Sequence, residues 1–144
     1  MSLHSITLTD DDRMLVATAL QVIAANYEQD RHRIGAAVRM RDGRVFTGIH
    51  VEAHVGRVTL CAEAVALGTA LSAGARDVDA VVAVAHPGPN DSASEVQVVS
   101  PCGMCRELVS DFGPQAWFIL SAGDSGASKV PVRDLLPAKY ARRD

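Results

Sequence analysis

Three cysteines and one glutamate are the side chains of this sequence whose types and spacing could do chemistry. Cys102 and Cys105 lie three positions apart in PCGMCRE, and Cys61 precedes Glu63 by two positions in TLCAEAV. A pair of thiols at this spacing could be a redox couple, a structural disulfide or half of a metal site. Because an odd number of cysteines cannot all pair within one chain, a disulfide scaffold is disfavoured.

The two cysteines of PCGMCRE are predicted to lie in the first turn of a helix. Ser100 is the expected N-cap and Pro101 the first helical residue, where the missing amide hydrogen costs nothing. Positions i and i+3 share one helix face, and the exposed amide groups of a first turn stabilise thiolates. Two sulfurs side by side make half of a tetrahedral metal site.

Cys61 lies in the first turn of a second predicted helix, which Thr59 is expected to cap. Cys61 and Glu63 are i and i+2, so both can serve one centre only if that centre lies over the helix end. Three protein ligands with an open fourth position are typical of catalytic zinc, whereas structural zinc has four protein ligands. Since the chain has no fourth cysteine, water is the expected fourth ligand.

The elements that must position these side chains alternate between helix and strand. A helix is predicted to begin after Thr9, with three acidic residues in its first turn. Asp42-Gly43 predicts the tight turn of a hairpin, and VDAVVAVAH, residues 96–99 and AWFIL are predicted as further strands. A last short helix is expected over residues 132–140. The pattern predicts one α/β domain over residues 1–144, with helices on the faces of a central sheet.

Composition and charge argue against several classes of protein. Apolar residues make up 48% of the chain and the formal net charge is −3. A protein that neutralises phosphates would show a basic excess, so we expect no nucleic-acid partner. No apolar run approaches the ~18 residues of a membrane span, and the first residues lack the features of a signal peptide. A cytoplasmic protein without a membrane partner is expected.

The two cysteine motifs together resemble the signature of a known family. Residues 61–63 (CAE) and 101–106 (PCGMCR) are similar to the C-A-E … P-C-x-x-C pattern of the cytidine deaminase family. GAAVRMRDGRVFTGIHVE resembles the first hairpin of that family, and LLPAKY its C-terminal ending. Blasticidin S deaminase, a branch of the same family, is similar at DGRVFTG, LGTA and LLPAKY. Cysteine at the first ligand position resembles the free-nucleoside branch, since relatives that edit nucleic acids usually carry histidine there.

This resemblance implies a three-layer α-β-α fold with a mixed central sheet of about five strands. It also implies one Zn²⁺ per subunit, held by Cys61, Cys102 and Cys105, with water or hydroxide as the fourth ligand. Hydroxide supplied at the zinc would attack C4 of a cytosine ring, and Glu63 would carry protons from the water to ring N3 and to the departing amine. The reaction expected first is hydrolysis of cytidine or deoxycytidine to the uracil nucleoside and ammonia.

The resemblance also indicates which residues bind the substrate. His32 and His50 stand where relatives commonly carry phenylalanine and asparagine, and Glu52 is retained as an acceptor for a ribose hydroxyl. His50 and Glu52 alternate onto one face of the second hairpin strand, which agrees with a shared role. Ala62 and Pro101, next to the metal ligands, are also expected to contact the substrate.

Two further features concern charge and assembly. Three thiolates around a dication sum to −1, which opposes ionisation of the water. Ala64 and Met104 stand where relatives carry arginine, which leaves Arg106 as the candidate for charge compensation. Tyr140 is similar in position to an aromatic residue that reaches a neighbouring subunit's site in the family. The resemblance implies a homo-oligomer, a tetramer before a dimer.

Three alternatives stay open. Blasticidin S, which also presents a cytosine ring, could be the substrate in place of cytidine. The chain could be a zinc-binding module without turnover, although the odd cysteine count and Glu63 argue against it. A thioredoxin-like oxidoreductase could use Cys102 and Cys105, but Cys61 and Glu63 would then have no role.

Overall fold

A seven-stranded sheet forms the centre of the structure, a computed structural model that describes residues 3–91 and 97–143. The strands run in the order β1-β7-β6-β4-β2-β3, and β5 also pairs with β4. β4 and β6 are parallel and the other pairs are antiparallel, so the sheet is mixed. The strands are β1 (Ile6–Thr7), β2 (Ile34–Met40), β3 (Val45–Ile49), β4 (Val78–Ala85), β5 (Gln97–Val99), β6 (Trp117–Ser121) and β7 (Ala127–Pro131).

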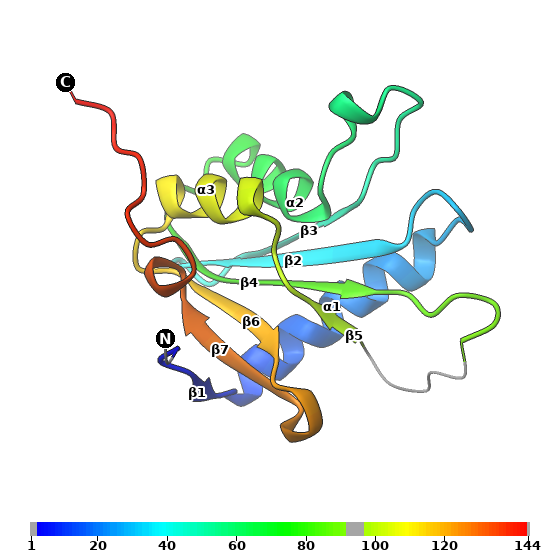
Figure 1. Ribbon diagram of the computed structural model, residues 1–144, viewed down its shortest axis with the longest axis horizontal. Helices are drawn as coiled ribbons and strands as arrows, with labels where there is room; N and C mark the ends of the chain where they lie inside the picture. Colours follow the sequence, from blue (N-terminus) through cyan, green and yellow to red (C-terminus); the bar gives the residue numbers. More distant parts are fainter. Residues whose placement is uncertain (1–2, 92–96, 144) are drawn as a thin grey trace.

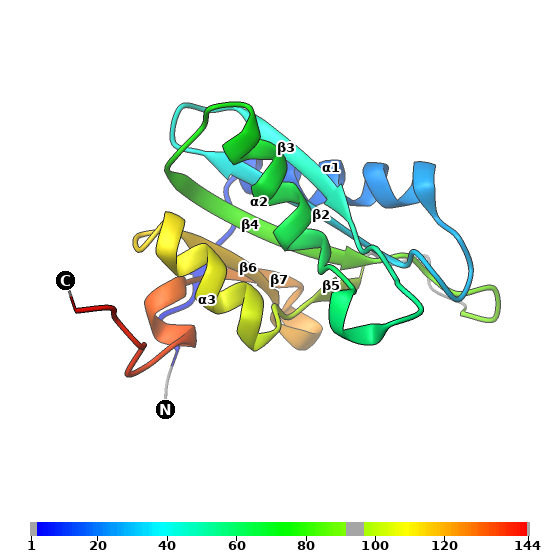
Figure 2. The ribbon, with the colours of Figure 1, turned by 90° about the horizontal axis from the view of Figure 1, so that it is seen from above.

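Helices cover both faces of the sheet, which makes three layers (Figures 1 and 2). α1 (Asp10–Asn26) lies on one face, and α2 (Ala62–Ser72) and α3 (Gly103–Phe112) lie on the other. The predicted three-layer α/β fold is confirmed. The sheet has seven strands instead of about five, because β1 and β7 add to the predicted set. Val96 of the predicted strand over residues 96–99 lies outside the described residues.

The first helix begins as the sequence predicts. Thr9 is the N-cap: its Oγ1 accepts from the backbone N–H of Asp12 at 3.2 Å, and the Asp12 carboxylate accepts from the Thr9 N–H at 2.9 Å. This capping box satisfies two otherwise free amide groups. Asp12 is also fully buried, and its two oxygens bind Arg39 of β2 and Lys129 of β7 at 2.8 Å each. Charged contacts therefore fix the start of α1 to two strands of the sheet.

Both faces of β4 are buried. Val81 and Ala83 belong to the apolar cluster formed with α2 and α3, whereas Ala80, Val82 and Val84 belong to the cluster formed with α1. A strand that is covered on both sides carries apolar residues almost continuously, which explains its sequence. Each fully buried valine or larger aliphatic side chain contributes about 1.5–3 kcal/mol, so the two clusters hold the layers together.

Gly48 of β3 lets α2 approach the sheet closely. A Cβ atom at this position would lie 2.4 Å from the backbone nitrogen of Ala66 and 2.7 Å from the carbonyl oxygen of Ala62. Protein interiors are close-packed, so a larger residue would push the strand and the helix apart. Because α2 begins at Ala62, this contact sets the position of the helix start next to Cys61.

The chain after β7 departs from the prediction. A 3-10 turn covers Val132–Leu135, in place of a helix over residues 132–140. Pro137 explains the early end, because proline disfavours helical backbone at the preceding residue and lacks an amide donor. The last described residues form an irregular tail that leads away from the sheet (Figure 1). No helix of the described part of the chain is both long and apolar enough to cross a membrane.

Candidate metal centre and active site

Cys61 and Cys102 occupy the N-cap positions of α2 and α3. Both have extended backbone, with φ and ψ of −66° and 145° at Cys61 and of −69° and 167° at Cys102. Each carbonyl oxygen accepts a first helical hydrogen bond, from the N–H of Val65 and of Arg106. The side chain of an N-cap residue lies over the exposed amide groups of the helix, so both sulfurs are placed at helix ends.

The two helices begin two residues later than the sequence predicts. Thr59 and Ser100 are not the caps, and Pro101 precedes α3 instead of opening it. The Thr59 Oγ1 accepts a hydrogen bond from the backbone N–H of Ala53 at 3.1 Å, outside the helix. The cap preference of threonine and serine is therefore overridden by the tertiary arrangement that brings the sulfurs together.

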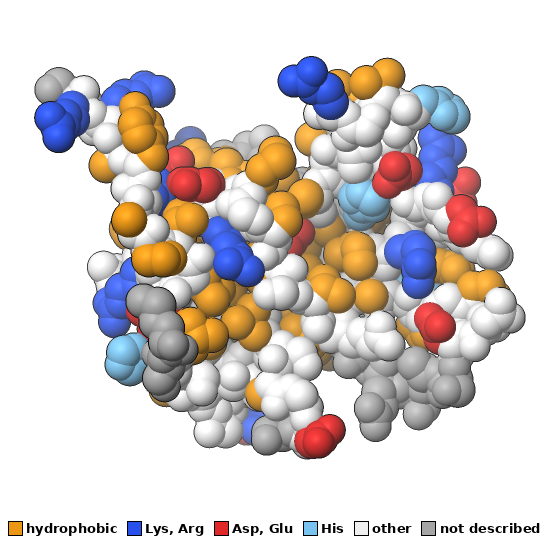
Figure 3. Space-filling view, viewed as in Figure 1, with side chains coloured by type: hydrophobic (Ala, Val, Ile, Leu, Met, Phe, Trp, Pro, Cys, Tyr) orange, Lys and Arg blue, Asp and Glu red, His pale blue; other side chains and the backbone are white. Residues whose placement is uncertain are grey.

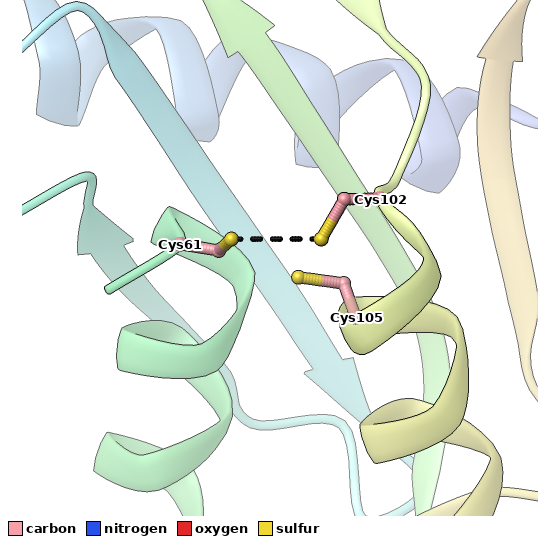
Figure 4. Close-up of side chains that lie close together, drawn as sticks. All are labelled: Cys61, Cys102 and Cys105. Atoms are coloured by element: carbon pink, nitrogen blue, oxygen red, sulfur yellow. Dashed lines mark hydrogen bonds between the residues drawn. The ribbon is translucent and has the colours of Figure 1, made fainter. Parts of the chain in front are cut away.

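Three sulfurs converge between the starts of α2 and α3 (Figure 4). The Sγ atoms of Cys61 and Cys102 are 3.6 Å apart, and the three Sγ atoms, that of Cys105 included, all lie within 4.8 Å of one another. Sulfurs on one tetrahedral zinc ion lie about 3.8 Å apart, since a Zn–S bond is about 2.3 Å long. The donor set and its spacing fit zinc. Cys105 is buried and Cys102 is exposed, so a fourth ligand could enter from the side of Cys102.

The protonation of the three thiols depends on their burial. Burial raises the pKa of the Cys61 thiol, and burial together with the Glu63 carboxylate raises the pKa of Cys105. At Cys102 burial acts in the same direction, but hydrogen bonds from the Cys105 backbone and side chain hold the pKa below its ordinary value. Buried thiols with a raised pKa become thiolates when a cation offsets their charge. Zinc binding at this site is therefore expected to release protons.

The side chain of Glu63 lines a hollow of about 290 Å³ beside the sulfurs, which we call the catalytic hollow. The Glu63 side chain is almost fully covered, and burial raises its pKa. A buried carboxylate next to an open metal position can exchange protons with a ligand bound there. The catalytic hollow is lined by Ile34, His50, Cys61, Ala62, Glu63, Val99, Ser100 and Cys102.

His50 lines the catalytic hollow, whereas Glu52 and His32 lie beside it. His50 Nε2 is 3.3 Å from a Glu52 oxygen, and Glu52 lines the next hollow along the surface. His32 Nδ1 donates to the backbone carbonyl of His50 at 2.8 Å, and its Nε2 lies 3.7 Å from a Glu28 oxygen. The geometry gives His32 the role of holding the His50 backbone. Its direct contact with a substrate stays a prediction, as does that of Glu52.

Comparison with known proteins places the metal centre in a family. Residues 9–121 match the family model described as the cytidine and deoxycytidylate deaminase zinc-binding region. The chain belongs to this deaminase family. The family match and the three converging sulfurs together support one zinc ion per subunit, bound by Cys61, Cys102 and Cys105.

Two relatives and one solved structure match nearly the whole length of the chain. The blasticidin-S deaminase of Bacillus cereus is 41% identical over 140 residues, which is 97% of this chain and 99% of that protein. The cytidine deaminase of Halalkalibacterium halodurans is 32% identical over 136 residues, 93% of this chain and 97% of that protein. The crystal structure of cytidine deaminase from Mycobacterium tuberculosis has a TM-score of 0.73 at 29% identity, and the match covers 94% of this chain and 100% of that one.

Arg106, the arginine expected to offset the thiolate charge, donates its hydrogen bonds to backbone carbonyl groups. Arg106 Nε donates to the Pro101 carbonyl at 3.0 Å, and Nη1 donates to the Leu135 carbonyl at 3.3 Å. Within the described residues no hydrogen bond joins Arg106 to a sulfur. Arg106 therefore holds the segment before Cys102 against the turn at Leu135, and its charge acts on the thiolates only through space.

Of the other predicted substrate residues, some line the catalytic hollow and some do not. Ala62 lines it, and its contact with a substrate stays a prediction. Pro101 is buried and is not among the residues that line the hollow. Its carbonyl oxygen accepts the hydrogen bond from Arg106. Tyr140 is 77% exposed on the C-terminal tail and lines neither this hollow nor the ones beside it. Its contact with a neighbouring subunit's site stays a prediction.

Three residues line the catalytic hollow without a sequence prediction. Ile34 is the first residue of β2, and Val99 and Ser100 stand directly before the PCGMC motif. Neither apolar residues in a strand nor a serine in a loop carries a chemical signal of its own. Adjacency to the motif in the chain was the signal available for Val99 and Ser100.

Proposed function

We propose that the deaminase hydrolyses a cytosine nucleoside to the uracil nucleoside and ammonia. The observation that carries this proposal is the position of Glu63, a buried carboxylate that shares one hollow with Cys61 and Cys102. A structural zinc site has four protein ligands and needs no carboxylate beside it. A hydrolytic site has three protein ligands and a group that moves protons.

The reaction requires an activated water and a proton carrier. Zinc, when bound, lowers the pKa of a water ligand from ~16 to about 7, so that hydroxide is available near neutral pH. Glu63 would accept one proton from the attacking water and pass it to ring N3, and would then accept the proton of the new C4 hydroxyl group and pass it to the exocyclic amino group. The water oxygen bonds to C4 and the C4–N bond breaks, so that ammonia leaves. Water and the nucleoside supply all the atoms of the products.

The size and lining of the catalytic hollow suit a single pyrimidine ring. Its volume of about 290 Å³ lies at the lower limit of about 300–1,000 Å³ for small-molecule pockets. Ile34 and Val99 can cover the faces of a ring, and the Ser100 hydroxyl can donate to or accept from a ring heteroatom. A ring placed there would direct its amino group toward the sulfurs and its sugar toward His50.

Two cytosine nucleosides are candidates for the substrate. Cytidine, or deoxycytidine, is the substrate of first choice from the cysteine motifs. Blasticidin S is the second candidate, and one observation favours it: the blasticidin-S deaminase of Bacillus cereus shares 41% identity with this chain, against 32% for the cytidine deaminase of Halalkalibacterium halodurans. The histidines at positions 32 and 50, where many cytidine deaminases carry other residues, are compatible with either substrate.

The test follows the cytosine absorbance band of cytidine, deoxycytidine and blasticidin S with the purified, zinc-loaded protein. We expect the parent to remove the band. Glu63→Gln should retain one zinc ion per chain and be at least about a hundredfold slower, the usual value of general acid-base catalysis. Bound zinc without turnover of any of the three compounds would favour the zinc-binding module. Full activity after chelation would remove zinc from the mechanism.

We also propose that the deaminase forms a homo-oligomer, a tetramer before a dimer. An apolar groove of about 360 Å³ runs between α2 and α3, on the upper side of the molecule in the view of Figure 3. Val58, Leu60 and Met104 on this side are half or more exposed. Exposed apolar patches of this kind usually mark an interface. Light scattering should give a multiple of the 15.2 kDa chain mass, and the monomer mass at micromolar concentration would overturn the proposal.

The cytoplasm is the proposed location, and free nucleosides are the proposed partners. Three cysteines without a disulfide are typical of a reducing compartment. The net charge of −3 does not favour nucleic acid as a partner.

A further inference from the structure

The three sulfurs of the metal centre differ in their exposure to solvent. Cys102 is exposed and Cys61 is half-buried, and both line the catalytic hollow. Cys105 is only 1% exposed and does not line that hollow. A small polar reagent that enters the catalytic hollow therefore meets Cys102 and Cys61 before it meets Cys105.

Cys61 and Cys102 are also placed to bond to one another. Their Sγ atoms are 3.6 Å apart and face each other from the starts of α2 and α3 (Figure 4). A disulfide bond is about 2.0 Å long, so the two sulfurs must approach by only about 1.5 Å. Each residue is an N-cap with extended backbone, so a small shift there leaves the regular turns of both helices intact.

The surroundings of these two thiols favour oxidation at Cys102. Exposed thiols near helix N-termini are the ones that oxidants attack selectively, whereas buried structural thiols stay inert. An oxidised cysteine escapes irreversible oxidation when a second thiol lies close enough to form a disulfide with it. Cys61 is in position to act as this resolving thiol, because it shares the catalytic hollow with Cys102.

We propose that Cys102 and Cys61 form a reversible redox switch, in which a hydroperoxide oxidises Cys102, Cys61 resolves it as a disulfide, and zinc is released. Zinc leaves because the disulfide removes two of its three protein ligands. The effect on turnover rests on the proposed deamination, whereas the disulfide and the release of zinc do not. Disulfides in reducing compartments are usually transient and often redox-sensing, which fits a switch that a dithiol can reset.

The two steps of the oxidation balance. The Cys102 thiolate attacks one oxygen of the hydroperoxide, the O–O bond breaks, and a sulfenic acid forms while water or an alcohol leaves. The Cys61 thiolate then attacks the Cys102 sulfur, the S–O bond breaks, and the departing hydroxide takes a proton to become water. The two sulfurs lose two electrons in total and the hydroperoxide gains them, with two protons supplied by the solvent.

The oxidised chain should stay folded, because the disulfide replaces zinc as the link between α2 and α3. Both helices remain packed on the apolar cluster that contains Leu67 of α2 and Val109 of α3. The new bond joins residues 41 positions apart and so restricts the unfolded chain. The oxidised zinc-free protein is therefore expected to melt about 5 °C or more above the reduced zinc-free protein.

The test treats the zinc-loaded parent with hydrogen peroxide and follows the release of zinc with a chromogenic chelator. The remaining thiols are then alkylated, and trypsin leaves Cys61 on residues 58–76 and both other cysteines on residues 77–106. We expect the loss of one zinc ion per chain, a disulfide that joins these two peptides, and one alkylated cysteine. Dithiothreitol with added zinc should restore the full zinc content.

Three results of this experiment would overturn the proposal. The first is a disulfide within residues 77–106 together with an alkylated Cys61, since Cys102 would then pair with Cys105. The second is a loss of zinc that dithiothreitol does not reverse, because the oxidation would then be damage. The third is a zinc content that peroxide does not change.

Variants assign the two sulfurs. In zinc-free Cys105→Ala, peroxide should still join the two peptides and raise the melting temperature. Zinc-free Cys102→Ala should join them at least about tenfold more slowly, because the remaining partner is the buried Cys105. Equal rates in these two variants would overturn the assignment of Cys102. Thermal melting before treatment shows whether each variant is folded.

The matched control is Met104→Ala, because Met104 is 77% exposed beside Cys102 and peroxide also oxidises methionine. Zinc should leave this variant at the rate of the parent. A variant that keeps its zinc in peroxide would overturn the proposal, since methionine oxidation would then be the cause of release.

Peptide mapping separates this proposal from the proposed reaction. If peroxide joins Cys61 to Cys102 and releases zinc, but the reduced zinc-loaded protein turns over no cytosine compound, the deamination fails and the switch stands. If the reduced protein is active and peroxide stops turnover without joining the two peptides, the switch fails and the deamination stands.

Discussion

The sulfurs of Cys61 and Cys102 lie 3.6 Å apart, although 41 positions separate these residues in the chain. Each residue is the N-cap of a helix, and both helices lie on the same face of the sheet (Figures 1 and 4). The amide groups of both first turns therefore point toward one place, where their partial positive charge favours thiolates and a hydroxide ligand. The packing of two helices on one sheet thus builds the metal centre.

Loss of one sulfur should remove most of the zinc affinity. Loss of a residue that only supports a metal ligand typically costs 10–100-fold in metal affinity, so Cys61→Ala should cost at least about a hundredfold. Competition with a chromogenic chelator measures the effect. Met104→Ala is the matched control, because this residue stands between Cys102 and Cys105 but is 77% exposed. Equal zinc affinity in Cys61→Ala and the parent would exclude Cys61 as a ligand.

A single methyl group at position 48 should disturb the metal centre from a distance. The Cβ of Gly48→Ala would lie 2.4 Å from the Ala66 nitrogen, so β3 and α2 must separate. We expect a loss of about 1–3 kcal/mol in the free energy of unfolding and weaker zinc binding. Gly68→Ala, inside α2 with nothing within 4 Å of its Cβ, should instead stabilise the helix. Urea denaturation checks both variants, and an unchanged Gly48→Ala protein would contradict the close approach.

The buried carboxylate of Asp12 should make the fold sensitive to acid. Burial alone would raise the pKa of Asp12, but hydrogen bonds from Lys129, from Thr9 and from Arg39 outweigh it and hold the pKa well below its ordinary value of 3.8. A carboxyl whose pKa is lowered by folding stabilises the protein fully above its unfolded pKa, and the contribution is lost as the pH falls toward the folded pKa. The free energy of unfolding should therefore decline below about pH 4.

Asp12→Asn tests this carboxylate directly. Removing one partner of a buried ion pair costs about 3–5 kcal/mol. The lower end of this range is expected, because Arg39 still has its ion pair with Asp79, at 2.6 Å, in the variant. The acid-dependent decline of stability should be smaller in Asp12→Asn than in the parent. Asp11→Asn, at the exposed neighbouring position, should change the stability by no more than about 1 kcal/mol. Denaturation curves at pH 3 to 7 give the free energy of unfolding at each pH. An equal decline of this free energy in the parent and in Asp12→Asn would show that Asp12 is not the acid-sensitive group.

His32 should act through the backbone of His50. His32→Phe removes the hydrogen bond to the His50 carbonyl, which is worth about 0.5–1.5 kcal/mol, so KM should rise roughly two- to tenfold while kcat changes little. His32→Asn can present an amide donor near the position of Nδ1 and should restore the parent KM. Steady-state kinetics on a cytosine nucleoside measures both variants. A fall in kcat with unchanged KM would place His32 at the reacting atoms instead.

Local patterns predict the chemistry of the site better than its framework. The ligands Cys61, Cys102 and Cys105 carry residue types and spacings that few structural roles require. The cap at Thr9 and the turn at Gly43, whose φ is 90°, depend on the backbone of a few neighbouring residues. For these elements the sequence is sufficient.

Other features depend on contacts between distant parts of the chain. The start of α3 lies at Gly103 because packing places Cys102 at the N-cap, although Ser100 is the better cap by preference. β1 has two residues and exists because it pairs with β7. Ile34 lines the catalytic hollow through its position at the end of β2, and no property of its own indicates this.

X-ray absorption at the zinc edge tests the central claim most directly. In the zinc-loaded protein the first shell should contain three sulfurs at about 2.3 Å and one lighter oxygen ligand at about 2.0 Å. A shell of this composition means three protein thiolates and a position open to water next to Glu63. A fourth protein donor in the shell, or fewer than three sulfurs, would contradict the account of a catalytic zinc centre.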